Sequence, residues 1–161
     1  MDHANILINI RKILRSINLE SKRIQKTYGI SIPQYLTLNY LHSQPEFKST
    51  SKSLKTHLNL NASTVTGIIR RLESKGLVAK LPNEKDKRST YIHLTALGAS
   101  KTKEMPPLMH EKLSEKLKTL SSKEIEEIHL SLEKLVNYMG VQNLDASPLI
   151  VPEDFIEKSE D

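Results

Sequence analysis

The chain has 161 residues, of which 37% are hydrophobic and only 4% aromatic, so its core must be built mainly from Leu and Ile. The complete lack of cysteine excludes a disulfide framework and thiolate metal sites, and no apolar run approaches the roughly 20 residues that span a bilayer. The acid at Asp2 stands where a secretion signal carries basic residues, which favours a cytoplasmic protein.

The net charge of +5 is unevenly distributed along the chain. Residues 49–100 carry nine Lys or Arg against three Asp or Glu, whereas residues 141–161 carry one Lys against six acids. The basic segment suits a polyanion such as nucleic acid, and a soluble basic surface without a partner is the alternative reading.

The sequence pattern of residues 5–58 predicts three helices. Apolar residues at steps of three and four predict an amphipathic helix over residues 5–26, stopped near Gly29. The chain restarts at Ser31-Ile-Pro33, with Pro33 at an early position of a second helix that continues over Gln34–Ser43 and is ended by Pro45. A short third helix covers Ser51–Leu58. We expect residues 1–48 to supply a dimerisation helix and a support helix.

The fourth predicted helix, after Asn61 and before Gly76, has two different faces. Asn61 can cap it, and Gly76 suits the left-handed position that closes a helix. One face is an apolar stripe centred on Ile68 and Ile69. The other is polar and basic, which suits base edges flanked by phosphates. We predict DNA contact for Asn61 and for the residues of this face, which are Ser63, Thr64, Thr66, Gly67, Arg70 and Arg71. Helix-start chemistry alone is the alternative for Ser63 and Thr64.

Two strand-like runs follow, Leu77–Leu81 and Thr90–Leu94, separated by a charged loop. A helix followed directly by a basic hairpin is typical of a winged helix, whose helix enters the major groove while the hairpin tip reaches the backbone or minor groove. The sequence therefore predicts a mainly α fold with a small β-hairpin wing, and a winged helix-turn-helix domain over residues 49–100. At the tip, the predicted DNA-contacting residues are Lys85, Asp86, Lys87 and Arg88.

Residues 101–140 complete the predicted helical platform. A fifth helix begins at Thr95, is bent or interrupted at Pro106-Pro107, and resumes towards Leu120. A sixth runs from Ser121 to about Met139 and ends at Gly140. These helices and the first one need a partner surface, so we expect a homodimer, with an intramolecular bundle as the alternative. The expected interface residues are Ile6, Ile10, Ile13, Ile17, Leu117, Ile128, Leu132 and Leu135.

Residues 141–161 form an acidic tail that contains two prolines. We expect it to be extended or partly disordered, with Leu149-Ile150-Val151 and Phe155-Ile156 as docking points.

The wing resembles that of the MarR family of bacterial transcription regulators. The stretch Asp86-Lys-Arg88-Ser89-Thr-Tyr-Ile92-His-Leu94-Thr95-Ala-Leu-Gly98 matches the family pattern D-x-R-S-x-x-(apolar)-x-L-T-x-x-G at each specified place. Ser63-Thr-Val-Thr66 and Arg71-Leu-Glu-Ser-Lys-Gly-Leu-Val78 are similar to the family's reading helix and the strand after it. The helix order agrees over about residues 5–140.

The resemblance implies a homodimeric repressor that binds a pseudo-palindromic operator and is released by a small effector. It also implies that Arg88 enters the minor groove, that Asp86 braces the wing, and that Ser63, Thr64 and Gly67 read bases. Gly67 and Arg70 depart from the side chains that are common in the family at these places, so Arg70 is expected to contact phosphate.

An effector pocket of the family's kind would have its walls at Ile10, Leu14, Tyr35, Tyr40 and Leu108, where plain core packing is the alternative. No cofactor, catalytic motif or metal-binding spacing is present, so we expect no enzyme. Two alternatives stay open. One is a winged-helix module that binds protein, and the other is a metal-responsive regulator with ligands among His42, His110 and Glu111.

Overall fold

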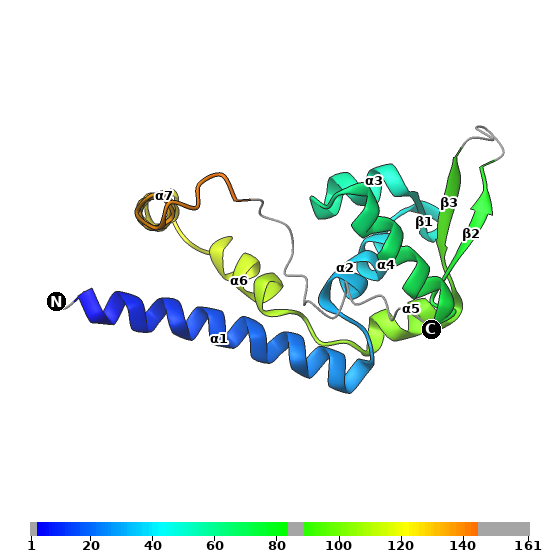
Figure 1. Ribbon diagram of the computed structural model, residues 1–161, viewed down its shortest axis with the longest axis horizontal. Coiled ribbons are helices and arrows are strands. Elements are labelled where there is room, and N and C mark those ends of the chain that lie inside the picture. Colours follow the sequence, from blue (N-terminus) through cyan, green and yellow to red (C-terminus); the bar gives the residue numbers. More distant parts are fainter. Residues whose placement is uncertain (1–2, 84–88, 145–161) are drawn as a thin grey trace, which may run out of the picture. The chain divides into compact units, whose positions relative to one another are not determined.

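The structure, a computed structural model, describes residues 3–83 and 89–144 (Figure 1). The described chain divides into two compact units, residues 3–106 and residues 107–144. Residues 3–106 hold six of the helical segments and all of the described strands, in the order α1 (His3–Tyr28), α2 (Ile32–Ser43), the 3-10 turn η1 (Pro45–Phe47), β1 (Lys48–Thr50), α3 (Ser51–Leu58), α4 (Ala62–Ser74), β2 (Val78–Pro82), β3 (Thr90–Leu94) and α5 (Ala96–Glu104). The predicted fold class, mainly α with a small wing, is confirmed.

The core of residues 3–106 is aliphatic and drawn from most of its elements. Helices α2, α3 and α4 pack against one another, and α2 and α3 also pack against β3, whereas α4 packs against β2. The side chains at its centre are less than 2% exposed, and they include Ile24, Ile30, Leu38, Leu41, Leu54, Ile68, Ile69, Leu72 and Ile92. Of α1, only Ser21 and Ile24 are buried, so most of that helix lies outside the core.

Local signals set the helix boundaries as the sequence predicted. Gly29 takes a left-handed φ of 69° directly after α1. Ser31 caps α2 through a capping box, in which its hydroxyl accepts from the Gln34 amide at 3.4 Å and the Gln34 side chain accepts from the Ser31 amide at 3.1 Å. α2 thus begins at Ile32, with Pro33 at the early helical position that the sequence predicts, and α3 has the predicted bounds.

The strands form an antiparallel sheet in the order β1-β3-β2 (Figure 1). β2 begins one residue later than predicted, and β3 has the predicted bounds. β1 was not predicted, because its three polar residues show no strand pattern and its pairing with β3, Ser49 opposite Ile92, is a long-range contact. The turn before it places Glu46 and Phe47 at φ of 54° and 53°, a conformation unusual for residues other than glycine.

Residues 107–144 contain α6 (Met109–Leu117) and α7 (Ser122–Met139). The predicted interruption at Pro106-Pro107 is a full break, since α5 ends at Glu104 and a new helix begins at Met109. Ser121 and Glu124 form a capping box at the start of α7, and the hydrogen bonds from Ser121 lower the pKa of the Glu124 carboxyl. Neither helix buries a single residue. Within the described ranges, no helix has the length and apolarity to cross a membrane.

Candidate nucleic-acid interface

Helix α4 separates an apolar face from a polar one, as its sequence predicts. Val65, Ile68, Ile69 and Leu72 are at most 2% exposed and hold the helix against the core. The opposite face is accessible: Ser63, Thr66 and Arg70 are exposed, and Thr64, Gly67 and Arg71 are half-buried. The structure therefore places all six of these predicted contact residues on an accessible side of one rigid helix.

The first turn of α4 is organised by Asn61. Its side-chain oxygen accepts from the Thr64 amide at 2.8 Å and from the Ser63 hydroxyl at 2.7 Å. The Thr66 hydroxyl donates to the Ala62 carbonyl at 2.8 Å. Both hydroxyl oxygens keep lone pairs that can accept from a base or a bound water. The helix N-terminus also carries partial positive charge, which favours a nearby phosphate.

Gly67 is not required by the packing of the protein itself. A Cβ built on it would meet only the end of the Arg71 side chain, at 3.8 Å, which is an ordinary van der Waals contact. An alanine there would stabilise the helix by about 1 kcal/mol. Because the glycine has no side chain, a binding partner can approach the backbone closely at the middle of the exposed face.

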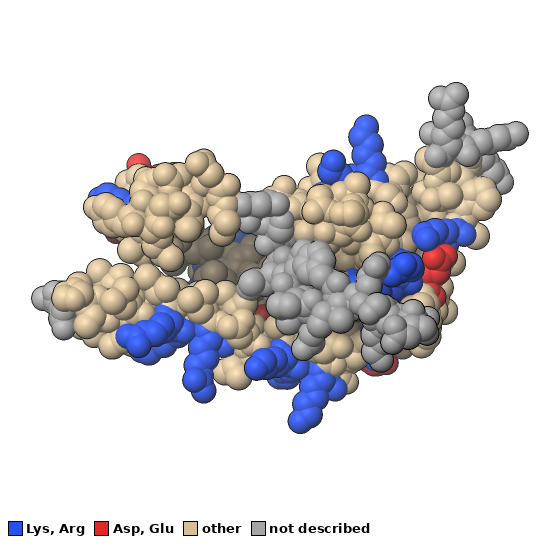
Figure 2. All heavy atoms as spheres, viewed as in Figure 1, with Lys and Arg blue, Asp and Glu red and all other residues tan. Residues whose placement is uncertain are grey.

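Helix α3, which packs against α4, adds cations that the sequence reasoning did not assign. Lys52 and Lys55 are exposed, and Figure 2 shows Lys and Arg side chains gathered over this helix. In a helix-turn-helix the first helix crosses the phosphate backbone. The signal was present in the sequence, because a spacing of three places both lysines on one face of a short helix.

The wing is anchored to the reading helix and closed near its end. Lys80 on β2 pairs with Glu73 on α4 at 2.9 Å, with both side chains about 40% exposed. The Asn83 side chain donates to the Ser89 hydroxyl at 2.8 Å across the two strands. The tip residues predicted to contact DNA, Lys85, Asp86, Lys87 and Arg88, lie outside the described residues.

The end of the wing motif, Thr95 to Gly98, locks β2 and β3 to α5. The Thr95 hydroxyl donates to the Gly76 carbonyl at 2.7 Å and accepts from the Gly98 amide at 3.0 Å. A Cβ on Gly98 would lie 2.1 Å from the Leu77 carbonyl oxygen, so this position tolerates only glycine without a shift of the backbone. These residues of the motif therefore fix the base of the wing.

The five residues predicted to wall an effector pocket have different environments. Tyr35 and Leu108 are buried at 5% and 0% exposure, Ile10 is half-buried, and Leu14 is 56% exposed. Tyr40 stacks on His57 of α3, with ring centroids 4.2 Å apart. Tyr40 thus packs against α3, the first helix of the helix-turn-helix.

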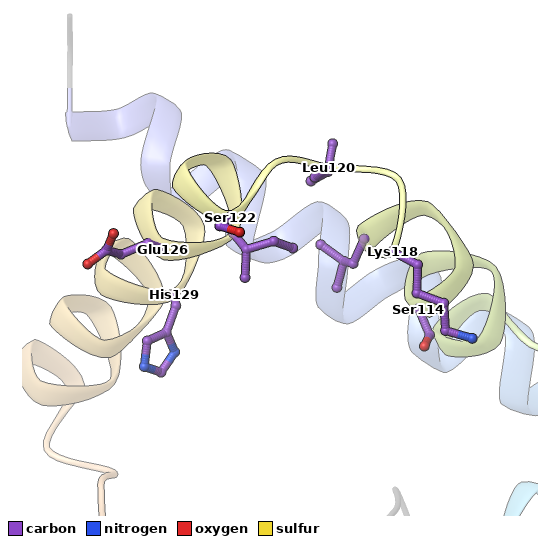
Figure 3. Close-up of a pocket in the computed structure, with 8 residues that line it drawn as sticks. Ser114, Lys118, Leu120, Ser122, Glu126 and His129 are labelled. Atoms are coloured by element: carbon purple, nitrogen blue, oxygen red, sulfur yellow. The ribbon is translucent and has the colours of Figure 1, made fainter.

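A shallow groove that the sequence reasoning missed lies between α6 and α7 (Figure 3). Its volume is about 620 Å³. Apolar side chains from both helices and from the loop between them line it, chiefly Leu117, Leu120 and Ile125, with Lys118 and Glu126 beside them. The Nε2 atom of His129, at its end, lies 3.4 Å from Glu133. Across the part of the chain that is described, no three His, Asp or Glu side chains gather closely enough to hold a metal ion.

Known proteins resemble this chain most clearly over the segment that contains α4. Residues 30–90 match the model of the MarR family. The transcriptional repressor IacR of Pseudomonas putida is 26% identical over 112 residues, which cover 70% of this chain and 66% of IacR. The transcriptional regulator MgrA of Staphylococcus aureus is 29% identical over 117 residues, which cover 73% of this chain and 77% of MgrA. The alignment thus spans slightly under two thirds of IacR.

Solved structures share the fold. The S. aureus MepR–DNA complex superposes with a TM-score of 0.62 at 22% identity, covering 86% of this chain and 98% of MepR. The heme sensor protein PefR of Streptococcus agalactiae, solved with heme, gives a TM-score of 0.59 at 23% identity, covering 87% of this chain and 97% of PefR. These likenesses confirm the winged-helix architecture.

Proposed function

We propose that this chain is a transcriptional regulator of the MarR family that binds double-stranded DNA through α4, α3 and the wing, and that it acts as a homodimeric repressor released by a small effector. The observation that carries the proposal is the accessible polar and basic face of α4, held rigidly by a fully buried apolar face. The relatives support DNA binding and regulation, since IacR is a transcriptional repressor, MgrA is a transcriptional regulator, and MepR was solved in complex with DNA.

The proposed contacts divide by chemistry. Ser63, Thr64 and Gly67, near the start of α4, face base edges, because the N-terminal residues of a reading helix enter the major groove. Arg70 and the α3 lysines contact phosphates, where exposed cations position a protein without reading sequence. Arg88 reaches the minor groove from the wing, as the resemblance implies.

Exposed apolar side chains support the homodimer. On α1, Ile6 and Ile13 are 47% and 56% exposed, and on α7, Ile128 and Leu132 are 41% and 53% exposed. Ile10, Ile17, Leu117 and Leu135, the other predicted interface residues, are half-buried. Helices with such stripes are stable in water when a second surface covers them. A two-fold dimer also places two reading helices on the two halves of a pseudo-palindrome.

Release by an effector requires a ligand that prefers a conformation unable to span both half-sites. The apolar and tyrosine side chains named above favour an aromatic acid as the effector class. A thermal-shift screen of aromatic acids tests this, and the ligand found must also weaken operator binding.

A gel-shift assay on the duplex upstream of the chain's own gene, repeated over a salt series, tests DNA binding. Binding must weaken steeply with salt, because Lys and Arg release counterions from phosphates. Arg70→Gln should reduce the logarithmic salt slope by about one for each chain bound. Lys116→Gln, which removes an equal charge from exposed α6, is the matched control and should leave the slope unchanged. A binding curve insensitive to salt would support a protein-docking module instead.

A further inference from the structure

Helix α1 carries a row of cations that the proposed DNA contacts do not use. With about 100° per residue, its Lys and Arg side chains fall within an arc of about 120°. The arc lies opposite the apolar stripe that holds Ile6 and Ile13. We call this row the cationic stripe, and its members are Arg11, Lys12, Arg15, Lys22, Arg23 and Lys26.

The cationic stripe is exposed and nearly free of counter-charges. All six side chains are on the solvent side of α1, and Figure 2 shows Lys and Arg in a row along the edge that α1 forms. Among the described residues, only Arg23 has an acidic partner, Glu20 at 4.0 Å. The stripe extends over about 22 Å, at a rise of 1.5 Å per residue. Six like charges at this spacing repel one another and attract a polyanion.

Two exposed apolar side chains divide the stripe. Ile8 and Leu19 are 39% and 56% exposed and lie on the same arc as the cations. They are separated by about 16 Å along the helix axis. The order along α1 is therefore Ile8, three cations, Leu19, three cations.

The acidic tail repeats this order with opposite charge. Leu149-Ile150-Val151 is followed by Glu153 and Asp154, then by Phe155-Ile156, and then by three acids and one lysine, which are Glu157, Lys158, Glu160 and Asp161. In an extended chain, at about 3.3 Å per residue, the centres of the two apolar groups are about 18 Å apart. That separation is close to the spacing of Ile8 and Leu19.

We propose that the acidic tail docks along the cationic stripe of the same chain, running in the same direction as α1. Leu149-Ile150-Val151 covers Ile8, Phe155-Ile156 covers Leu19, and the acids pair with the two groups of cations.

The docked tail would hide a competing polyanion site. α1 runs along the opposite edge of residues 3–106 from the wing, so DNA on the cationic stripe would not reach the α4 face (Figure 1). With the stripe neutralised, α3, α4 and the wing are the dominant cationic surface. Non-specific DNA is thereby directed to the reading face.

Carbodiimide cross-linking of the full chain, read by mass spectrometry, tests the docking. We expect Lys12 to link to Glu153 or Asp154, and Lys22 and Lys26 to link to Glu157, Glu160 or Asp161. Mixed isotope-labelled and unlabelled chains separate links within a chain from links between chains. Links to Lys52, Lys55 or Lys75, links only between chains, or no links from the tail would overturn the proposal.

A charge swap tests the register. Lys22→Glu should reduce the yield of tail links to the second group of cations about two- to fivefold, the range for one exposed ion pair. Adding Glu157→Lys should create a link between positions 22 and 157. Lys123→Glu on α7 is the control and should change no link to α1. Failure of the double swap to form the new link would contradict the alignment.

Discussion

The reading head, which is α2 to α5 with the three strands, and the platform helices, which are α1, α6 and α7, bury their apolar side chains to different extents. In residues 3–106, α2, α3 and α4 bury apolar side chains almost completely, with Leu38, Leu54 and Leu72 at 0% exposure. In residues 107–144, α6 and α7 bury none, and Leu113, Leu132 and Met139 are more than half exposed. The head has its own core, whereas the platform helices need another surface. This difference predicts which changes depend on protein concentration and which do not.

The largest effect should come from breaking the platform with Ile13→Asp and Leu132→Asp together. Each buried side chain of this size contributes roughly 1.5–3 kcal/mol, and a two-fold axis counts each change twice. The dimer should split, or the chain unfold if no stable monomer exists, and operator binding should collapse although α4 is unchanged. Sedimentation beside a gel shift measures both. A double mutant that remains dimeric and binds DNA normally would contradict the two-headed account.

Leu72→Ala breaks the head instead. The side chain is fully buried, so its truncation should cost about 2–5 kcal/mol of stability through lost transfer energy and a cavity. Urea unfolding at two protein concentrations measures the effect on the head. If the head stands on its own core, this loss should be the same at both concentrations, unlike that of the platform mutant.

Arg88→Ala should change DNA recognition without changing the packing of the head or of the platform helices. Operator binding should weaken by about 1–3 kcal/mol, while the sedimentation coefficient and thermal midpoint stay at the wild-type values. A titration of labelled operator at moderate salt gives the affinity. Unchanged affinity would mean that the wing points away from the duplex.

Gly67→Ala should separate stability from binding within the head. Because the added Cβ has room, the head should gain up to about 1 kcal/mol. DNA binding should nevertheless weaken if the backbone approaches the bases closely. Denaturation gives the change in stability of this variant, and operator titration gives the change in its affinity for DNA. A variant that is both more stable and tighter binding would show that the glycine is not needed for close approach to DNA.

Removal of residues 141–161 should have the smallest effect on assembly. The tail lies beyond the last apolar stripe, and its proposed docking site is opposite the interface face of α1. Size-exclusion chromatography with light scattering should therefore still show a dimer. A monomer would mean that Leu149-Ile150-Val151 or Phe155-Ile156 crosses the interface.

The sequence could predict the helix ends and helix faces, which depend on residues close together in the sequence. Asn61, Thr95 and Ser121 cap their helices by accepting from amides three residues ahead, and Gly76 and Gly140 take the left-handed φ that follows a helix. Each of these is a short-range interaction with a clear residue preference. The polar face of α4 could be predicted for the same reason, since helical periodicity alone divides it from the buried stripe.

The sequence could not predict strand pairing, the groove or close tertiary contacts, because these depend on residues far apart in the sequence. β1 exists because Lys48–Thr50 pairs with β3, more than 40 positions away. The groove between α6 and α7 depends on how two helices diverge, and the cationic stripe gained significance only when the structure left that side of α1 uncovered. The glycine at position 98 matched the family pattern, but its cause, the Leu77 carbonyl, is a tertiary contact.

The mass of the complex between the chain and an operator duplex tests whether the protein binds DNA as a dimer. Sedimentation of the chain with a duplex found by the upstream gel shift gives the number of chains bound to each site. We predict two chains per site, bound through two heads and joined by one platform, with an affinity that falls steeply as salt rises. A saturated complex with one chain per site, or no complex at low salt, would contradict it.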